Sequence, residues 1–96
     1  MTRFNDATME LLGLIDEKKA NGKRLTMSDK VLLRLSDGEW HEAAELAYNV
    51  SWRFGGYLHN LKQMGVDWEK ERVPEAAAQV FRYRLCDVDD NGENHV

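Results

Sequence analysis

The residues from Ser51 to Gly65, SWRFGGYLHNLKQMG, constrain the fold more than any other stretch of the chain. Phe54, Leu58 and Leu61 recur at i, i+4 and i+7, which predicts a helix with one apolar stripe facing a core. Ser51 stands where an N-cap hydroxyl would accept hydrogen bonds from the first free N–H groups. Gly65 stands where a left-handed residue would end the helix. Both ends of this helix are therefore marked in the sequence.

The opposite side of the predicted helix, residues 51–64, carries Trp52, Gly56, His59 and Gln63 and no acidic residue. Trp52 lies out of phase with the apolar stripe, so an exposed binding role and packing against the N-terminal helix both remain open. Because this side is aromatic and polar without carboxylates, we expect the helix to be the element that touches a partner.

Two adjacent glycines, Gly55 and Gly56, lie inside the same predicted helix. Each costs roughly 1 kcal/mol relative to alanine in a helix interior. Either the missing side chains let the helix backbone sit close to a phosphate or another helix, or the helix is frayed or bent there. The sequence leaves both interpretations open.

Length and composition predict one small domain, because 96 residues suffice for a single core. No apolar run approaches the roughly 20 residues of a membrane span. The start, MTRFNDATMELLGLIDEKK, lacks the basic segment and apolar block of a secretory signal. With one cysteine, Cys86, no internal disulfide can form. A reducing cytoplasm is therefore the expected location.

Motifs for catalysis and metal binding are missing from the sequence. It contains no G-x-S-x-G elbow, no G-x-x-x-x-G-K-[ST] phosphate loop and no G-x-G-x-x-G turn. Its three histidines and one cysteine do not follow C-x-x-C or H-x-x-x-H spacing. We therefore expect no enzyme activity, no cofactor and no metal.

Charge is distributed unevenly along the chain, whose net charge is −4. Residues 1–50 carry seven Lys/Arg against nine Asp/Glu, and residues 85–96 carry four acids and no base. Residues 51–84 are the basic segment, with six Lys/Arg against four Asp/Glu. Its cations are interleaved with aromatic residues, a pattern that also suits a solvated surface of mixed charge.

A first helix is predicted over Asp6–Ala20, with Asn5 as N-cap and Asn21-Gly22 as the stop. Its apolar face is broad. This helix must either pack back on the rest of the chain or pair with the same helix of a second chain, giving a homodimer through residues 5–20. The sequence does not decide between these arrangements.

A second helix is predicted over Lys30–Ser36, after a Thr26 and Asp29 pair that resembles a capping box. The next segment, Glu39–His41, is too short for an independent strand. Trp40 between two polar residues fits one or two ladder pairs at the edge of a small sheet. We therefore expect a short pairing stub there.

A third helix, Glu42–Tyr48, follows, with His41 as a substitute cap. Alternation then predicts two strands, Val66–Val73 and Gln79–Asp87, which form a hairpin. The acidic tail, residues 88–96, is expected to be disordered. Four large aromatic side chains are expected in the core: Trp40, Trp68, Phe81 and Tyr83.

This order of elements resembles the winged-helix family over residues 28–87. The signals are LLRLSDGEW before the third predicted helix, AAELA within it, and Ser51 opening the next. The run Leu58, Leu61, Gly65, Val66 resembles the L-x-x-L-x-x-x-G-[VIL] ending of many recognition helices, and Phe81-x-Tyr83-x-Leu85 resembles the last strand.

The resemblance implies an α+β, mostly α fold: a winged helix-turn-helix with an extra N-terminal helix and a two-stranded wing. Residues 1–25 would form the N-terminal helix and linker, residues 26–87 the domain and residues 88–96 the tail. It also implies a small transcriptional regulator that binds double-stranded DNA sequence-specifically, with the helix over 51–64 in the major groove and the hairpin over 66–87 as the wing. The implied DNA-binding residues are Ser51, Trp52, Arg53, Gly56, His59, Asn60, Lys62, Gln63, Lys70, Arg72, Arg82 and Arg84.

An alternative function is a winged-helix module that binds proteins, as an adaptor or assembly subunit without DNA binding. The acidic net charge and the glutamates Glu69, Glu71 and Glu75 in the hairpin favour it. A third hypothesis is that the acidic tail covers the basic segment until DNA displaces it.

Overall fold

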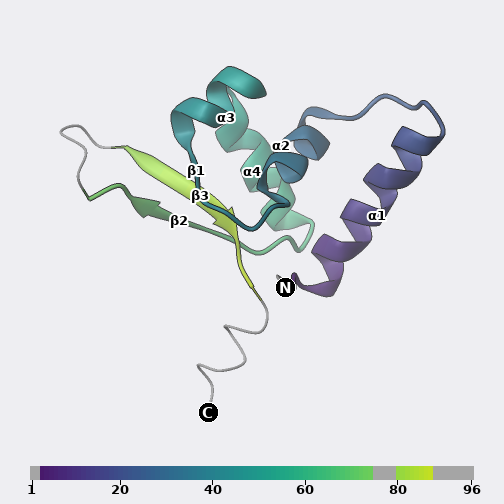
Figure 1. Ribbon diagram of the computed structural model, residues 1–96, viewed down its shortest axis with the longest axis horizontal. Coiled ribbons are helices and arrows are strands. Elements are labelled where there is room, and N and C mark those ends of the chain that lie inside the picture. The colour runs from purple at the N-terminus through teal and green to yellow at the C-terminus, as the bar shows by residue number, and fades with distance from the viewer. Residues whose placement is uncertain (1–2, 75–79, 88–96) are drawn as a thin grey trace, which may run out of the picture.

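Four helices and a small sheet make up the structure, a computed structural model that describes residues 3–74 and 80–87. In Figure 1, α2 and α4 lie in the middle, with α1 on one side of them and the sheet on the other. The expectation of an α+β fold is confirmed for the described residues, about half of which are helical. In chain order the elements are α1 (Asp6–Ala20), α2 (Met27–Leu35), β1 (His41–Glu42), α3 (Ala43–Asn49), α4 (Phe54–Gln63), β2 (Trp68–Arg72) and β3 (Phe81–Leu85).

Helix α1 has the predicted bounds, because its ends depend on local chemistry. The Asn5 side chain accepts a hydrogen bond from the Thr8 N–H at 2.9 Å, as an N-cap does. The same side chain donates through Nδ2 to the Gly65 carbonyl at 2.9 Å. One residue therefore starts α1 and ties it to the end of α4.

α1 packs back on its own chain, which was one of the two predicted arrangements. Phe4 and Ile15 are buried in the common core, and the Lys18 ammonium pairs with the Asp29 carboxylate of α2 at 2.7 Å. Two apolar side chains of α1 remain about half exposed: Met9 at 51% and Leu14 at 47%.

Helix α2 begins at Met27, earlier than the predicted Lys30, because the capping box forms at the helix start itself. The Thr26 hydroxyl accepts from the Asp29 N–H at 3.1 Å, and the Asp29 carboxylate accepts from the Thr26 N–H at 3.0 Å. Three of its apolar side chains are completely buried: Val31, Leu32 and Leu35.

Helix α4 is shorter than the predicted 51–64, since it begins at Phe54 with Arg53 as N-cap. The prediction of Ser51 as N-cap is wrong. Its hydroxyl accepts from the Arg53 N–H at 3.1 Å and so stabilises a turn before the helix. The predicted end is confirmed, because Gly65 has a φ of 96°, in the left-handed region.

The sheet is antiparallel with strand order β1-β3-β2. A short pairing segment is present, as β1, but it shares only His41 with the predicted 39–41 and does not include Trp40; it pairs His41 with Tyr83 and Glu42 with Arg82. The two predicted strands pair over a shorter span, from Trp68 opposite Leu85 to Arg72 opposite Phe81. The predicted tail, residues 88–96, lies outside the described residues.

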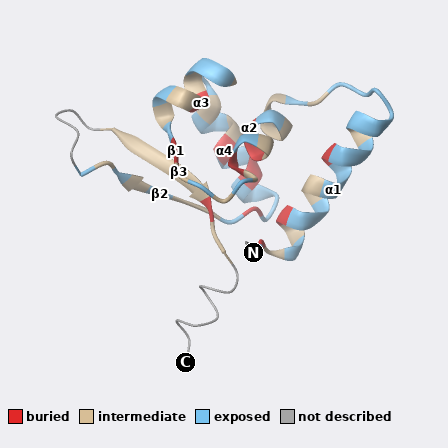
Figure 2. Cartoon of the chain, viewed as in Figure 1, coloured by how far each residue is buried: buried red, intermediate tan, exposed pale blue. Residues whose placement is uncertain are grey.

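The core lies where α1, α2, α3, α4 and the sheet meet (Figure 2). Trp68 and Tyr83 pack against it as predicted. The prediction is wrong for Trp40, which lies on the other face of the sheet beside Arg82 and Arg84. Phe81 is only half-buried and contacts Lys70. No helix within residues 3–74 and 80–87 combines the length and apolar character of a membrane span.

Candidate functional site

The outward side of α4 is exposed to solvent along its length. Leu58 and Leu61 are buried, whereas the residues on the other side are exposed. This confirms the predicted apolar stripe and the predicted polar side. The exposed residues of the helix are Gly55, Gly56, His59, Asn60, Lys62 and Gln63.

The turn before α4 presents Trp52 and Arg53 to solvent. Trp52 is 80% exposed, so it does not pack against α1, and of the two open interpretations only exposure fits. The Arg53 guanidinium lies over the Trp52 ring, 5.7 Å from its centroid. The indole therefore limits where this cation points.

Gly55 and Gly56 are not required by the fold. In the described residues the glycines with positive φ are Gly22, Gly38 and Gly65, so Gly55 and Gly56 have ordinary helical backbones. A methyl group built at either would meet nothing within 4 Å. The reason for glycine here is neither backbone conformation nor packing within the chain.

Strand β2 turns its cations toward α4. The Trp68 indole N–H donates to the Leu58 carbonyl of α4 at 2.8 Å, which fixes the face on which Trp68 lies. Because side chains alternate along a strand, Lys70 and Arg72 lie on that same face. Lys62 of α4 reaches it too, donating to the Trp68 carbonyl at 3.1 Å. The three predicted site residues Lys62, Lys70 and Arg72 are thus on one side of the sheet.

The other face of the sheet holds the glutamates, each bonded to an arginine of β3. Arg84 Nε donates to Glu69 at 3.0 Å. Arg82 Nε donates to Glu71 at 2.7 Å, and its Nη2 makes a second contact with the same carboxylate. Arg82 and Arg84 therefore lie across the sheet from Lys70 and Arg72, so the structure separates site residues that the sequence had grouped.

Ring contacts hold most of these cations. Within the described residues, five Lys or Arg side chains lie within about 6 Å of the centroid of an aromatic ring, the range in which a cation and a ring attract each other. The cations are therefore oriented before any partner arrives. The pairs are Arg53 with Trp52, Lys62 with Trp68, Lys70 with Phe81, and both Arg82 and Arg84 with Trp40.

His41 does not cap α3 as predicted; it lies between two carboxylates. Nε2 is 2.8 Å from an Asp37 oxygen, and Nδ1 is 2.5 Å from Glu45 Oε2. Burial lowers the pKa of His41, but the hydrogen bonds to Asp37 and Glu45 outweigh it and raise the pKa above 6.5. Burial raises the pKa of Asp37, and its bond to His41 with other hydrogen bonds lowers it below 3.8 overall. The one sequence signal of this cluster is the spacing of four residues on each side of His41.

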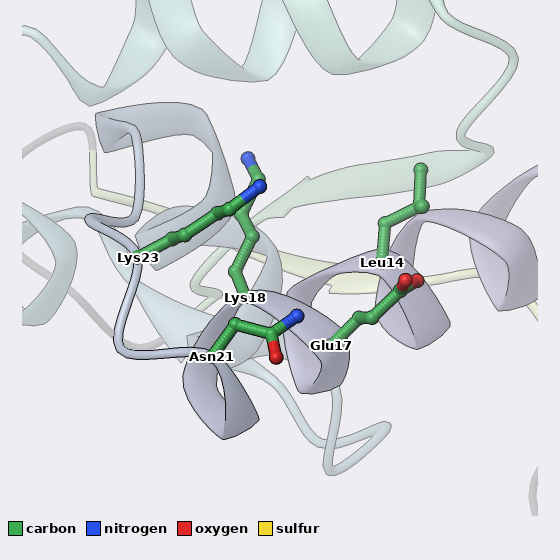
Figure 3. Close-up of a pocket in the computed structure, with 5 residues that line it drawn as sticks. All are labelled: Leu14, Glu17, Lys18, Asn21 and Lys23. Carbon is green, nitrogen blue, oxygen red and sulfur yellow. The ribbon is translucent and has the colours of Figure 1, made fainter.

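Several hollows are lined by residues of α1, and two of them by more than one such residue. The larger, about 500 Å³, lies between α1, the start of α2 and the end of α4, and Asn60 and Gln63 line it from α4. These two predicted site residues therefore border α1. The smaller, about 210 Å³, is drawn in Figure 3 at the end of α1 and the turn that follows. Its lining residues are Leu14, Glu17, Lys18, Asn21 and Lys23.

Two observations concern the chemistry of the described side chains. Residues 3–74 and 80–87 contain no group of three His, Cys, Asp or Glu side chains arranged to hold a metal ion. Burial, with the nearby charges of Asp67 and Glu69, raises the pKa of the Cys86 thiol to about 12. The absence of enzyme activity, cofactor and metal stays a prediction.

Comparisons with protein-family models, curated proteins and solved structures found no match to this chain. A function is therefore inferred from the exposed side of α4, the two faces of the sheet and the order of the elements.

Sequence reasoning missed Tyr48, at the end of α3, which is 90% exposed. It also missed the division of the hairpin cations between two faces. Strand alternation could have revealed this division, because Arg82 and Arg84 are out of phase with Phe81, Tyr83 and Leu85.

Proposed function

We propose that residues 28–87 act as a winged-helix domain that binds double-stranded DNA, as a small transcriptional regulator. The exposed side of α4 enters the major groove, and the α4-facing side of β2 lies on the DNA backbone beside it. The observation that carries the proposal is the separation of charge across the sheet.

In the sequence, the glutamates of β2 dilute the positive charge of the hairpin and favour the protein-binding alternative. However, Glu69 and Glu71 lie on the far face, paired with arginines, while Lys70 and Arg72 share the α4 side with Lys62. A phosphate on the α4 side therefore meets cations first, with the carboxylates behind the sheet.

The residues of α4 suit contacts with bases. His59 and Gln63 are exposed on the outward side and can bond base edges. Arg53, held against Trp52 at the helix start, can form paired hydrogen bonds with guanine. Gly55 and Gly56 leave the exposed side of the first turn without side chains, which allows a close approach of the DNA backbone.

Pairing of two chains through α1 is part of the proposal. Met9 and Leu14 keep apolar surface exposed on α1 after it has packed on its own chain. A two-fold dimer would bind two half-sites about one helical turn apart. Sedimentation at micromolar concentrations tests this: a monomer throughout would remove the dimer from the proposal.

The experiment compares alanine variants from the two faces of the sheet. Fluorescence anisotropy with a labelled duplex of mixed sequence measures affinity across a salt series. We expect Lys70→Ala and Arg72→Ala each to weaken binding and to reduce the slope of log K against log salt by about 0.9 per lost phosphate contact. Arg82→Ala and Arg84→Ala are the matched controls, and we expect them to leave affinity and slope unchanged.

Thermal unfolding of each variant shows whether a loss of duplex affinity comes from a less stable fold. An unmodified chain that fails to bind the duplex even at low salt would overturn the proposal. If variants on both faces of the sheet lose the same duplex affinity, the proposal that the α4 side of the sheet faces the DNA would be overturned. If an alanine variant no longer binds a protein partner but keeps its affinity for DNA, the result would favour the protein-contact alternative.

A further inference from the structure

The two most exposed large hydrophobic side chains of the described residues flank a single turn. Tyr48, in the last turn of α3, is 90% exposed, and Trp52, before the start of α4, is 80% exposed. The others, Met9, Leu14 and Met64, keep roughly half of their surface covered. Single exposed apolar residues are ordinary on protein surfaces. A Tyr and a Trp only four positions apart, each with a hydrogen-bonding group, more often mark a contact surface.

The charge around this turn favours a polyanion. No Asp or Glu occurs between Glu45 and Asp67, although the chain contains 17 acids. Glu45 itself is bonded to His41. The nearest charged side chain to Trp52 in the sequence is Arg53, whose guanidinium lies over the indole ring. A phosphate approaching this turn meets a cation and two aromatic side chains, and no free carboxylate from the residues between 46 and 66.

The turn is also continuous with the proposed interface. It leads directly into α4, whose first exposed residues are Gly55 and Gly56. A duplex with α4 in its major groove passes one strand of its backbone near the start of that helix. Tyrosine hydroxyl groups are common donors to phosphate oxygens, and aromatic rings can lie against sugars.

We propose that Tyr48 and Trp52 together hold the sugar–phosphate backbone of a DNA duplex beside the start of α4. Tyr48 donates its hydroxyl hydrogen to a phosphate oxygen, and Trp52 lies against the neighbouring sugar while keeping Arg53 in place. This inference rests on the proposed function and adds Tyr48 to its residues.

The test uses the complete chain with Tyr48→Phe, Tyr48→Ala and Trp52→Ala. Tyr57→Phe is the matched control, because it removes the same hydroxyl from a half-buried ring that packs against the core. Anisotropy with the labelled duplex should show Tyr48→Phe binding about tenfold more weakly, the size of one hydrogen bond to a charged group. Its salt slope should stay unchanged, since no positive charge is lost. Tyr48→Ala and Trp52→Ala should bind more weakly still, with unaltered thermal unfolding, and Tyr57→Phe should bind as the unmodified chain does.

Each other outcome has a distinct meaning. If the unmodified chain binds the duplex and the Tyr48 variants bind equally well, this inference fails while the proposed function stands. If the unmodified chain binds no duplex, both fail. A single-stranded oligonucleotide of equal length provides a third arm. If Tyr48→Phe leaves duplex binding intact and Tyr48→Ala weakens only the single strand, the ring stacks on bases and the phosphate contact is wrong.

Discussion

Gly65, just after α4, lies against Ala7 of α1: a methyl group built at Gly65 would come within 3.0 Å of the Ala7 Cβ. Gly65 also has a φ of 96°. Both facts require glycine at this position. They also make it the point where the packing of α1 depends on the end of α4.

We therefore expect Gly65→Ala to lower the free energy of unfolding by at least about 1–2 kcal/mol, the cost of a left-handed residue with a Cβ. Urea unfolding followed by circular dichroism measures the change. Gly22→Ala is the matched control, because Gly22 has a φ of 69° but nothing within 4 Å of an added methyl group. A Gly65→Ala loss no larger than that of Gly22→Ala would show that contact with Ala7 contributes nothing.

Alanine at Gly55 or Gly56 should have the opposite effect. Both glycines have ordinary helical backbones and open space around a built Cβ. Alanine should therefore raise the free energy of unfolding by up to about 1 kcal/mol at each position. The same urea experiment measures it. Either variant proving less stable than the unmodified chain would contradict the structure of this turn. A gain in stability with a loss of duplex affinity would show that the backbone itself meets the DNA.

His41 should make stability depend on pH. Its pKa is raised above 6.5 in the folded chain, so folding favours the proton. The stabilisation is complete below pH 6.5 and is lost as the pH rises through the higher folded value. The pKa of Asp37 is lowered, so its contribution is present above pH 3.8 and is lost as the pH falls through the lower folded value. The cluster therefore stabilises the fold most between pH 3.8 and pH 6.5.

Urea midpoints across this range test the His41 cluster. His41→Gln should abolish the decline above pH 6.5 and lower stability on the acid side of that value. His59→Gln is the control, because it removes an imidazole from an exposed position of α4. If the decline survives in His41→Gln, another group causes it.

Cys86 should react slowly in the native state. Its pKa is raised from 9.0 to about 12, and its thiol donates to Glu69 at 3.4 Å. Only the thiolate is nucleophilic, so at pH 8 the reactive fraction is on the order of a thousandfold below that of an ordinary thiol. Alkylation by iodoacetamide, followed by mass spectrometry, should be slow in buffer and fast in urea. Equal rates in both solvents would contradict the raised pKa of the Cys86 thiol in the folded chain.

The sequence predicted those parts of the fold that depend on nearest neighbours. Asn5, the Thr26 and Asp29 pair, and Gly65 each act through bonds within a few residues, so the corresponding helix ends were confirmed or nearly so. Ser51 shows the limit of this reasoning. Its hydroxyl can accept a hydrogen bond either as an N-cap or within a turn, from the Arg53 N–H. Which of these bonds forms depends on where the chain enters α4.

The site was less predictable, because it depends on which side of the sheet each residue faces relative to α4. Alternation alone separates Lys70 and Arg72 from Glu69 and Glu71. Only the Trp68 contact with Leu58 shows which of these sets faces the helix. The packing of α1 likewise depends on Asn5 and Gly65, which are distant in the sequence, and no local pattern predicts such a contact.

The two faces of the sheet also bear on how the molecule would meet a polyanion before contact. The chain has a net charge of −4, so as a point charge it would be repelled. The α4 side of the sheet carries Lys70 and Arg72, whereas Glu69 and Glu71 on the other side are balanced by Arg84 and Arg82, so the sheet has a dipole moment on which the field of DNA would exert a torque. That torque would turn the Lys70 and Arg72 side toward the phosphates within the screening distance of roughly 8–10 Å. If the protein binds DNA as proposed, alignment would come before attraction, and the distribution of its charge would matter more than the total.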